Sequence, residues 1–308
     1  MAVVLEQLKN KTYPIVKWVG GKRQLMFELL KNMPKSYNRY FEPFIGGGAL
    51  FFELQPEQAY ISDMNEELIN LYSVVRDNVY GLIDNLSKHE VSKEYFLEIR
   101  NIDRTEKYAE FSDVERASRF IYLNRTCFNG MYRVNSQGQF NVPFGHYKNP
   151  RIIDENNLLN CSELLKKTEI KCVDFSEILT KVQKGDFVYF DPPYVPLNET
   201  SSFTSYTKYG FDIDMQFKLR DVCDELDSMG VKFMLSNSDT KLVNEVSGLI
   251  DWTRLNINAK QGDVISIVYK KDSSGDKNDD CVYLRYFTCG TPVVVTFHAN
   301  GGTGADYT

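Results

Sequence analysis

The stretch RYFEPFIGGGALFFELQPEQAYISDMN, residues 39–65, decides the fold of this 308-residue chain. Its apolar beginning, Tyr40–Ile45, is typical of a buried strand, and the glycines at 46–48 break that strand. Ala49–Leu54 then suits a short helix, and Ala59–Ile61 is extended again. The order strand, glycine turn, helix, strand is typical of an α/β protein. Asn65 or Asp63 then begins a helix with amphipathic spacing.

A second alternation of strands and helices begins near Ile170. Asp186–Phe190 is a short apolar strand, which the following prolines end because proline cannot donate to a β-ladder. Met215–Met229 has helical spacing, and Val231–Leu235 is a further buried strand. We therefore predict an α/β fold with a doubly wound, mainly parallel mixed sheet. Ligands of such sheets lie at the carboxyl ends of the strands.

The segment between the two alternations has a different pattern, with helices first and turns afterwards. Short runs such as Met131–Val134 and Gln139–Val142 are separated by glycine-containing turns, which predicts a β-hairpin. We interpret residues 67–154 as an inserted, mainly helical subdomain. Residues 1–66 and 155–271 would then form the main domain.

Composition and charge exclude several classes of protein. With 36 Lys and Arg against 42 Asp and Glu, the net charge is −6, and 43% of the residues are hydrophobic. No apolar run approaches the roughly 18 residues that suggest a membrane span. The six cysteines form no CxxC pair, and only three histidines are available to complete a metal-binding cluster, so a structural zinc site is not expected. We expect a cytoplasmic protein without a metal. The tail, residues 272–308, stays unassigned.

Asp191-Pro192-Pro193-Tyr194 is the strongest chemical signal, and it follows a predicted strand directly. The exocyclic amine of an aromatic base is a poor nucleophile because its lone pair is delocalised into the ring. A carboxylate and a backbone carbonyl that accept its N–H bonds can aim that lone pair at an electrophile. Two prolines would hold these acceptors rigidly, and Tyr194 offers a face on which a base can stack. The alternative is a strand that merely ends in a turn.

The glycine turn at 46–48 is the second signal. Glycines after a first strand let a ligand approach the backbone, and the N-terminus of the next helix favours a carboxylate. The turn matches neither the phosphate loop nor the dinucleotide fingerprint. Asp63, after the next strand, is placed to accept ribose hydroxyls. S-adenosylmethionine has a carboxylate and a ribose but no phosphate, so it fits both features. A plain tight turn explains the glycines equally well.

Two basic segments complete the set. Lys17–Arg23 joins glycines to a Trp and to cations, and taken alone it is better explained as a solvated basic turn. Residues 116–151 contain no Asp or Glu, and aromatic residues are interleaved among six cations, which are Arg116, Arg119, Arg125, Arg133, Lys148 and Arg151. This run predicts a phosphate-facing patch with stacking or wedging side chains, with a solvated basic face as the alternative.

Five motifs, in the same order, resemble the Dam-type family of DNA N6-adenine methyltransferases, in particular its GATC-modifying members. They are KWVGGKRQL (17–25), RYFEPFIGGGALFF (39–52), FNGMYRVNSQGQFNVPFG (128–145), Val173–Phe175 and Asp191–Tyr194. The resemblance implies a Rossmann-like methyltransferase. Such an enzyme transfers methyl from S-adenosylmethionine to the N6 amine of an adenine flipped out of double-stranded DNA.

The resemblance also implies roles for individual residues. Asp191 and the carbonyl of Pro192 would accept from the N6 amine, and Tyr194 would stack on the adenine. Cofactor contacts are implied for Trp18, Lys22, Phe44, Gly46, Gly48, Asp63, Asp174 and Asp191. Arg133 matches the residue that recognises guanine, and Phe128, Asn129, Met131 and Pro143 match positions at or beside the target bases. Arg125 and Lys148 join them from the basic run. No metal is implied, because the sulfonium is already activated.

The expected setting is that of a monomer on DNA, in a bacterial nucleoid or a phage-infected cell, with a restriction endonuclease as a separate partner in some family members. A protein glutamine N5-methyltransferase is one alternative, although that class uses Asn where Asp191 stands. A catalytically impaired DNA-binding module is another. Two stretches depart from the family pattern. Ala259–Gly262 is shorter than the usual basic loop, and residues 272–308 match nothing in the family.

Overall fold

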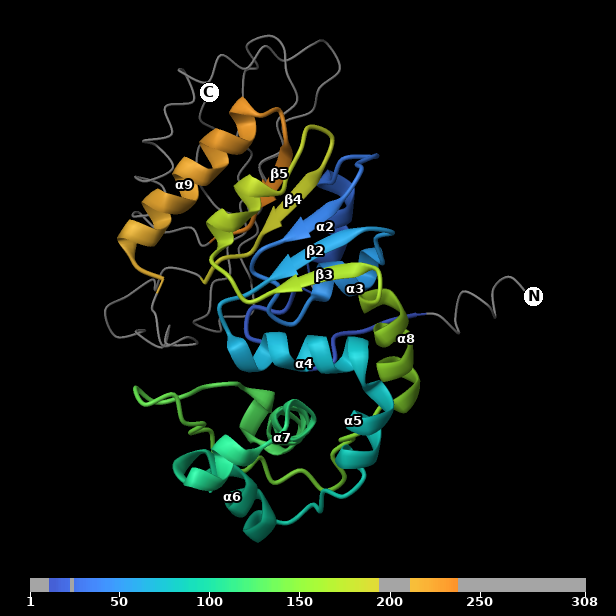
Figure 1. Cartoon of the computed structure of the whole chain (residues 1–308), viewed down its shortest axis with the longest axis vertical. Helices are drawn as coiled ribbons and strands as arrows, with labels where there is room; N and C mark the ends of the chain where they lie inside the picture. Colours follow the sequence, from blue (N-terminus) through green and yellow to red (C-terminus); the bar gives the residue numbers. More distant parts are fainter. Residues whose placement is uncertain (1–10, 23–24, 194–210, 238–308) are drawn as a thin grey trace, which may run out of the picture.

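The computed structural model of the chain describes residues 11–22, 25–193 and 211–237. Within these residues, five parallel strands form one sheet in the order β3-β2-β1-β4-β5 (Figure 1). The strands are β1 (Tyr40–Glu42), β2 (Ala59–Ser62), β3 (Thr168–Lys171), β4 (Phe187–Phe190) and β5 (Lys232–Leu235). The predicted doubly wound α/β fold is confirmed. All of the described strands are parallel, so the antiparallel strand that a mixed sheet requires is not found among the described residues.

The strand order places a topological switch point between β1 and β4. From β1 the chain proceeds outward through β2 to β3, and it then returns to add β4 and β5 on the other side of β1. Tyr40 of β1 pairs in parallel both with Ala59 of β2 and with Phe187 of β4. Ligands of open α/β sheets bind at such a point, outside the carboxyl ends of the strands.

Helices cover both faces of the sheet. On one face Tyr40, Phe187 and Tyr189 pack in a core with α2 (Met26–Asn32), α3 (Ala49–Leu54), α4 (Glu66–Asp77) and α8 (Glu155–Leu165). On the other face Phe41, Val188 and Phe190 pack with η5 (Phe175–Thr180) and α9 (Ile213–Ser228). Neighbouring residues of one strand thus serve opposite faces, as the two-residue period of a strand requires.

The middle of the chain forms a helical layer beyond α4. Its elements are α5 (Val79–Leu86), α6 (Lys93–Asn101), η2 (Ile102–Arg104), η3 (Glu106–Glu110), α7 (Asp113–Thr126) and η4 (Phe128–Gly130). In Figure 1, α7 and α6 lie on the side of α4 that faces away from the sheet. Phe120 of α7 packs in the core of α4, while Tyr122 packs in a separate core with Phe96 and Phe140. α7 therefore connects this layer to the main domain.

Local capping fixes where these helices begin. Of the two candidates for α4, Asn65 is the N-cap, because its side-chain oxygen accepts the backbone N–H of Leu68 at 3.1 Å. Ser112 and Glu115 form a reciprocal capping box at the start of α7. None of the helices in the described part of the chain is long and apolar enough to cross a membrane.

The predicted hairpin takes a looser form than expected. Residues 127–145 turn back on themselves through two isolated antiparallel bridges, Cys127 with Phe144 and Val134 with Phe140. Met131–Val134 and Gln139–Val142 are therefore not strands of a continuous ladder. At the tip the N–H of Asn135 donates to the carbonyl of Gln139 at 2.9 Å, and the side chain of Asn135 supplements this bond by accepting the N–H groups of Gln137 and Gln139 at 3.0 and 2.9 Å.

Candidate active site and DNA-recognition segment

The two strongest sequence motifs meet at the switch point. The glycine turn follows β1, and Asp191 follows β4, the strand that pairs directly with β1. Because both strands are parallel, their carboxyl ends open at the same edge of the sheet. Pro192 is buried beside Asp191. Tyr194, the predicted stacking residue, lies outside the described residues.

The glycine turn has a backbone that other residues adopt with strain. Gly46 and Gly48 have φ values of +44° and +68°. A Cβ on Gly46 would lie 2.7 Å from Cδ1 of Trp18, so the indole occupies the space that a side chain would need. The hydroxyl of Tyr72 donates to the carbonyl of Gly46 at 2.7 Å. The turn is therefore fixed from two sides, with Trp18 packed against it.

Asp63 fixes the turn from a third side. Its Oδ2 accepts the N–H of Gly46 at 3.1 Å, and its Oδ1 accepts the N–H of Asn65 at 2.9 Å. Burial raises the pKa of the carboxyl, although these bonds lower it in part. Asp63 follows β2, next to β1, so the predicted acid stands at the same edge as the glycines.

The basic segment near the N-terminus reaches Asp191. Nζ of Lys22 lies 2.9 Å from Oδ1 of Asp191, with side-chain exposures of 5% and 21%. The same Nζ donates to the carbonyl of Gly20 at 2.7 Å. A solvated basic turn is therefore the wrong interpretation of this segment, at least for Lys22: the structure places Lys22 against Asp191 and Trp18 against the glycine turn. The sequence alone cannot show this, because the partner is 169 positions away.

Glu42 is a residue of the site that the sequence argument treated only as part of a strand. It is buried, and its Oε2 accepts the hydroxyl of Tyr40 at 2.6 Å. Burial raises its pKa to about 8; the bond from Tyr40 opposes this, and the charge of Asp191 adds to it. An acid directly before a proline in a run of aromatic residues was the available signal. At neutral pH this carboxyl is largely protonated.

Phe44 follows β1 and Asp174 follows β3, so both stand beyond the carboxyl ends of parallel strands. The ring of Phe44 stacks on Phe175 with 5.1 Å between centroids. Asp174 caps η5, and its Oδ1 accepts from Ser176 and from Nζ of Lys218 at 2.7 Å. Burial would raise the pKa of Asp174, but these bonds outweigh it and lower the pKa. The two predicted cofactor residues thus lie on segments that follow β1 and β3, which are separated in the sheet by β2.

The predicted DNA-contacting residues gather on a turn that protrudes from the end of α7. Phe128 is 51% exposed, although its own N–H donates to the carbonyl of Pro143 at 2.8 Å. Asn129 is in the left-handed region, with φ of 55° and ψ of 10°. Met131 is half-buried, and Pro143 is exposed. An exposed aromatic ring on a strained, internally bonded turn is well placed to enter a partner molecule.

The other residues predicted to contact DNA differ in whether their side chains already bond to other parts of the protein. Nε of Arg133 donates to Oδ1 of Asn141 at 2.7 Å, so the guanidinium is oriented by a neighbour that the sequence argument did not name. Arg125 donates to the carbonyl of Ile15 at 2.6 Å, which connects α7 to the N-terminal segment. Lys148 is exposed.

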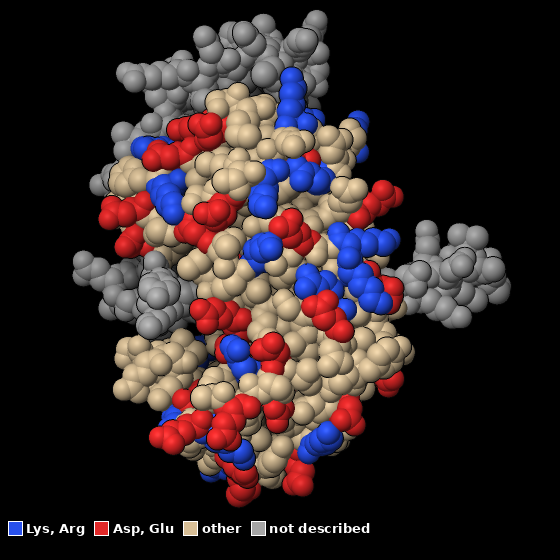
Figure 2. Space-filling model, viewed as in Figure 1, with Lys and Arg blue, Asp and Glu red and all other residues tan. Residues whose placement is uncertain are grey.

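The run of six cations does not form the predicted patch. Arg116 pairs with Glu67 at 2.6 Å, buried Arg119 pairs with Asp103 at 2.7 Å, and Arg151 pairs with Asp154 at 2.9 Å. Residues 116–151 contain no acid of their own, but the fold brings acids from outside that window. Figure 2 shows acidic and basic side chains interspersed over the described residues on the face in view. The prediction of a six-cation phosphate surface is therefore wrong for buried Arg119, and Arg116 and Arg151 are each paired with an acid.

Among the described residues, no group of three or more His, Cys, Asp and Glu side chains could hold a metal ion. What the edge of the sheet offers instead is a glycine turn, an acid after β2 and an Asp-Pro-Pro sequence after β4. On a doubly wound parallel sheet this set defines a Rossmann-like methyltransferase, and comparison with known proteins specifies the class.

Residues 18–256 match the D12 class N6 adenine-specific DNA methyltransferase family, and the chain belongs to that family. It is 52% identical to the type II methyltransferase M1.LlaDCHI of Lactococcus lactis subsp. cremoris over 79% of this chain and 87% of the relative. It is 46% identical to the type II methyltransferase M.MjaIII of Methanocaldococcus jannaschii over 73% and 84%. A DNA adenine methylase of Haemophilus influenzae is 34% identical over 77% and 84%. The protein is thus an adenine-specific DNA methyltransferase.

Proposed function

We propose that this protein transfers a methyl group from S-adenosylmethionine to the N6 amine of adenine within GATC in double-stranded DNA. The observation that carries the proposal is the pairing of Lys22 with Asp191 at the switch point, directly beside the glycine turn. Relatives named DNA adenine methylase support the substrate base. The turn Phe128-Asn129-Gly130 and Arg133 match the GATC-modifying members of the family, and this match supports GATC as the target sequence.

The residues present fit S-adenosylmethionine. Gly46 and Gly48 shape the turn, since a Cβ at either would clash with Trp18 or Phe52, and the partly exposed Gly47 lies between them, just before the N-terminus of α3. Asp63 and Asp174 supply carboxylates after β2 and β3, and Phe44 supplies an apolar surface. When bound, the cofactor supplies an electrophilic methyl group on a sulfonium. Trp18, Lys22, Phe44, Gly46, Gly48, Asp63, Asp174 and Asp191 would hold it.

The chain's own part in the reaction is to hold the amine. Asp191 and the carbonyl of Pro192 accept its two N–H bonds, which localises the lone pair and stabilises positive charge as it develops on nitrogen. The buried ammonium of Lys22 pairs with Oδ1 of Asp191 at 2.9 Å and so fixes the position of that oxygen. Glu42, with its pKa raised to about 8, adds little negative charge behind Asp191 at neutral pH. Tyr194 would stack on the base.

The DNA is held by the exposed turn. Phe128 and Asn129 enter the stack beside the flipped adenine, Met131 and Pro143 contact neighbouring bases, and Arg133 recognises guanine. Lys148 supplies a phosphate contact. A separate restriction endonuclease partner is supported by the type II methyltransferase names of two relatives, and action as a monomer on DNA completes the proposal.

Transfer of labelled methyl from S-adenosylmethionine to short duplexes tests the proposal. Duplexes with one GATC should be labelled, whereas duplexes already N6-methylated on both strands, or altered at any one base pair, should be labelled far more slowly. Asp191→Asn keeps the shape of the side chain but loses the charge, and it should reduce kcat by at least about 100-fold. Asp221→Asn, on the exposed side of α9, is the matched control.

Three outcomes would contradict separate parts of the proposal. Equal labelling of duplexes with and without GATC would remove the sequence specificity but leave the reaction in place. Unchanged transfer by Asp191→Asn would remove the role of Asp191. Labelling of a protein glutamine in place of DNA would favour the other methyltransferase class.

A further inference from the structure

Arg133, the proposed guanine contact, depends on a neighbour for its orientation. Its Nε donates to Oδ1 of Asn141, and the N–H of Asn141 donates back to the carbonyl of Arg133 at 3.1 Å. Beyond this point the two sides of the turn are paired by the bridge between Val134 and Phe140 and by the bonds between Asn135 and Gln139 at the tip. Where Asn141 lies therefore decides where the guanidinium points, and the sparse backbone pairing does not by itself fix that place.

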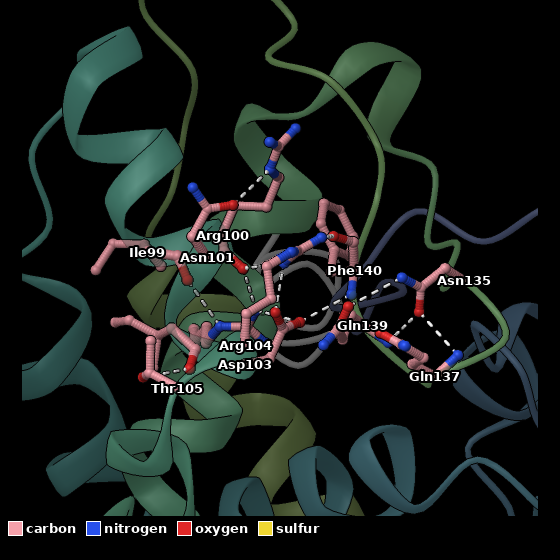
Figure 3. A network of polar contacts seen from close by, with 12 residues as sticks. Ile99, Arg100, Asn101, Asp103, Arg104, Thr105, Asn135, Gln137, Gln139 and Phe140 are labelled. Carbon is pink, nitrogen blue, oxygen red and sulfur yellow. Dashed lines mark hydrogen bonds and ion pairs between the residues drawn. The ribbon is translucent and has the colours of Figure 1, made fainter.

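Two charged side chains on η2 hold the residue next to Asn141 (Figure 3). Oδ2 of Asp103 accepts the N–H of Phe140 at 2.8 Å, and a terminal nitrogen of Arg104 donates to the carbonyl of Phe140 at 2.7 Å. Asp103 and Arg104 also pair with each other at 2.5 Å. A neighbouring β-strand would offer Phe140 the same two bonds. The ion pair thus takes the place of a strand at this edge of the hairpin.

Asp103 and Arg104 thus form a clamp on the backbone of Phe140, and this clamp is itself anchored in the helical layer. The side chain of Asp103 is 6% exposed, and its Oδ2 also accepts from Arg119 at 2.7 Å. Arg119 is buried and donates to the carbonyls of Ile99 and Arg100 at 2.9 Å each. Buried charges that are paired and fully hydrogen-bonded have one strongly preferred geometry. Phe140, 2% exposed, is therefore fixed to a rigid support.

We infer that Asp103 and Arg104 are positioning residues for base recognition: by holding both backbone groups of Phe140, they set Asn141 and, through it, the guanidinium of Arg133. The inference rests on the proposed role of Arg133. Neither side chain needs to contact DNA for this. Loss of the clamp should therefore affect the choice between sites more than the rate of methyl transfer at any one adenine.

Arg104→Met tests the inference with little disturbance of the fold, since the side chain is 30% exposed and methionine keeps most of its stem. The readout is the ratio of kcat/KM on a GATC duplex to kcat/KM on duplexes with one substituted base pair. We expect this ratio to fall by roughly fivefold to tenfold at the base pair that Arg133 recognises. Arg76→Met removes a guanidinium that bonds the adjacent Asp77 on α4, and it should leave the ratio unchanged.

A double-mutant cycle separates positioning from general stability. Because Arg104 acts through Arg133, adding Arg104→Met to Arg133→Met should lower the ratio no further. Arg104→Lys, which keeps a donor, should restore part of it. Equal losses on every duplex, or additive losses in the double variant, would overturn the inference. If Arg133→Met alone leaves the ratio unchanged, the proposed role of Arg133 fails instead, and the two failures are thereby distinguished.

Discussion

At the scale of single residues, Gly46 shows why the turn after β1 is made of glycine. Its φ of +44° and the 2.7 Å approach of Trp18 to a would-be Cβ are separate obstacles to a side chain. We predict that Gly46→Ala lowers the free energy of unfolding by about 2–4 kcal/mol, combining left-handed strain with the clash. Binding of S-adenosylmethionine, measured by equilibrium dialysis, should weaken with it because Trp18 must move.

Gly138 provides a matched control for this prediction. It has a similarly positive φ of +78°, but nothing lies within 4 Å of its would-be Cβ. Gly138→Ala should therefore cost only the strain, about 1–2 kcal/mol, and should leave cofactor binding unchanged. Equal losses of stability in urea for the two variants would mean that contact with Trp18 contributes nothing.

Glu42 makes a residue-scale prediction about pH. Its pKa is about 8 in the folded protein and near 4.5 when solvated, so the folded state holds a proton that the unfolded state releases. The stability that Glu42 contributes is complete below pH 4.5 and is lost as pH rises through 8. Glu42→Gln cannot ionise, and it keeps an acceptor for Tyr40. Between pH 5 and 8, the wild type should lose free energy of unfolding relative to Glu42→Gln, by at most about 1.4 kcal/mol per pH unit.

Thermal or urea unfolding of both proteins across this range checks the sign. The difference should level off above pH 8, where both states of the wild type are deprotonated. A difference that stays constant from pH 5 to 8 would mean that Glu42 is already ionised in the folded protein.

At the scale of elements, Asn124 ties three segments together. From within α7 its amide accepts the N–H of Lys17 at 2.9 Å and donates to the carbonyls of Lys17 and Gly130 at 2.9 and 2.8 Å. Asn124→Ala leaves these backbone groups without partners and should cost about 2–4 kcal/mol of stability in urea. Asn70→Ala, which loses one exposed bond to the carbonyl of Asp113, should stay within about 0.5 kcal/mol. Similar losses in both would show that the Asn124 amide is replaceable.

Elements with strong local signals could be predicted from the sequence. α3 has the predicted bounds Ala49–Leu54, and β4 starts one residue after the predicted Asp186, because apolar strands, glycines and prolines act through their immediate neighbours. For residues 127–145 the sequence predicted a reversal of the chain but not the register of its two sides. Its register depends on Asp103 and Arg104, which lie more than 30 residues upstream of Phe140. Contacts between distant segments leave no local pattern, and for the same reason the burial of Lys22 against Asp191 was out of reach.

At the scale of the whole molecule, counting charged residues along the sequence does not predict where free positive charge lies in the fold. The window from 116 to 151 is purely basic in sequence, yet Glu67 and Asp103 on other elements neutralise two of its arginines. Those ion pairs join α7 to α4 and to η2, so they stabilise the helical layer. Arg133 and Lys148 lie beyond them, on the segment that also carries the exposed Phe128. The residues proposed to recognise DNA are thus concentrated on one segment of an acidic protein.

This division of the cations leads to a prediction about salt. A side chain that neutralises a DNA phosphate releases a counterion, so its removal lowers the slope of log K against log salt by about 1. Lys148→Ala should lower the slope by that amount and leave the unfolding midpoint unchanged, since Lys148 is exposed. Arg116→Ala should do the reverse, because its guanidinium is bound to Glu67 at 2.6 Å. Binding of a GATC duplex from 50 to 200 mM salt, together with thermal unfolding, measures both quantities. If both variants lower the slope equally, Arg116 exchanges Glu67 for a phosphate when DNA binds, and the basic run acts as a whole after all.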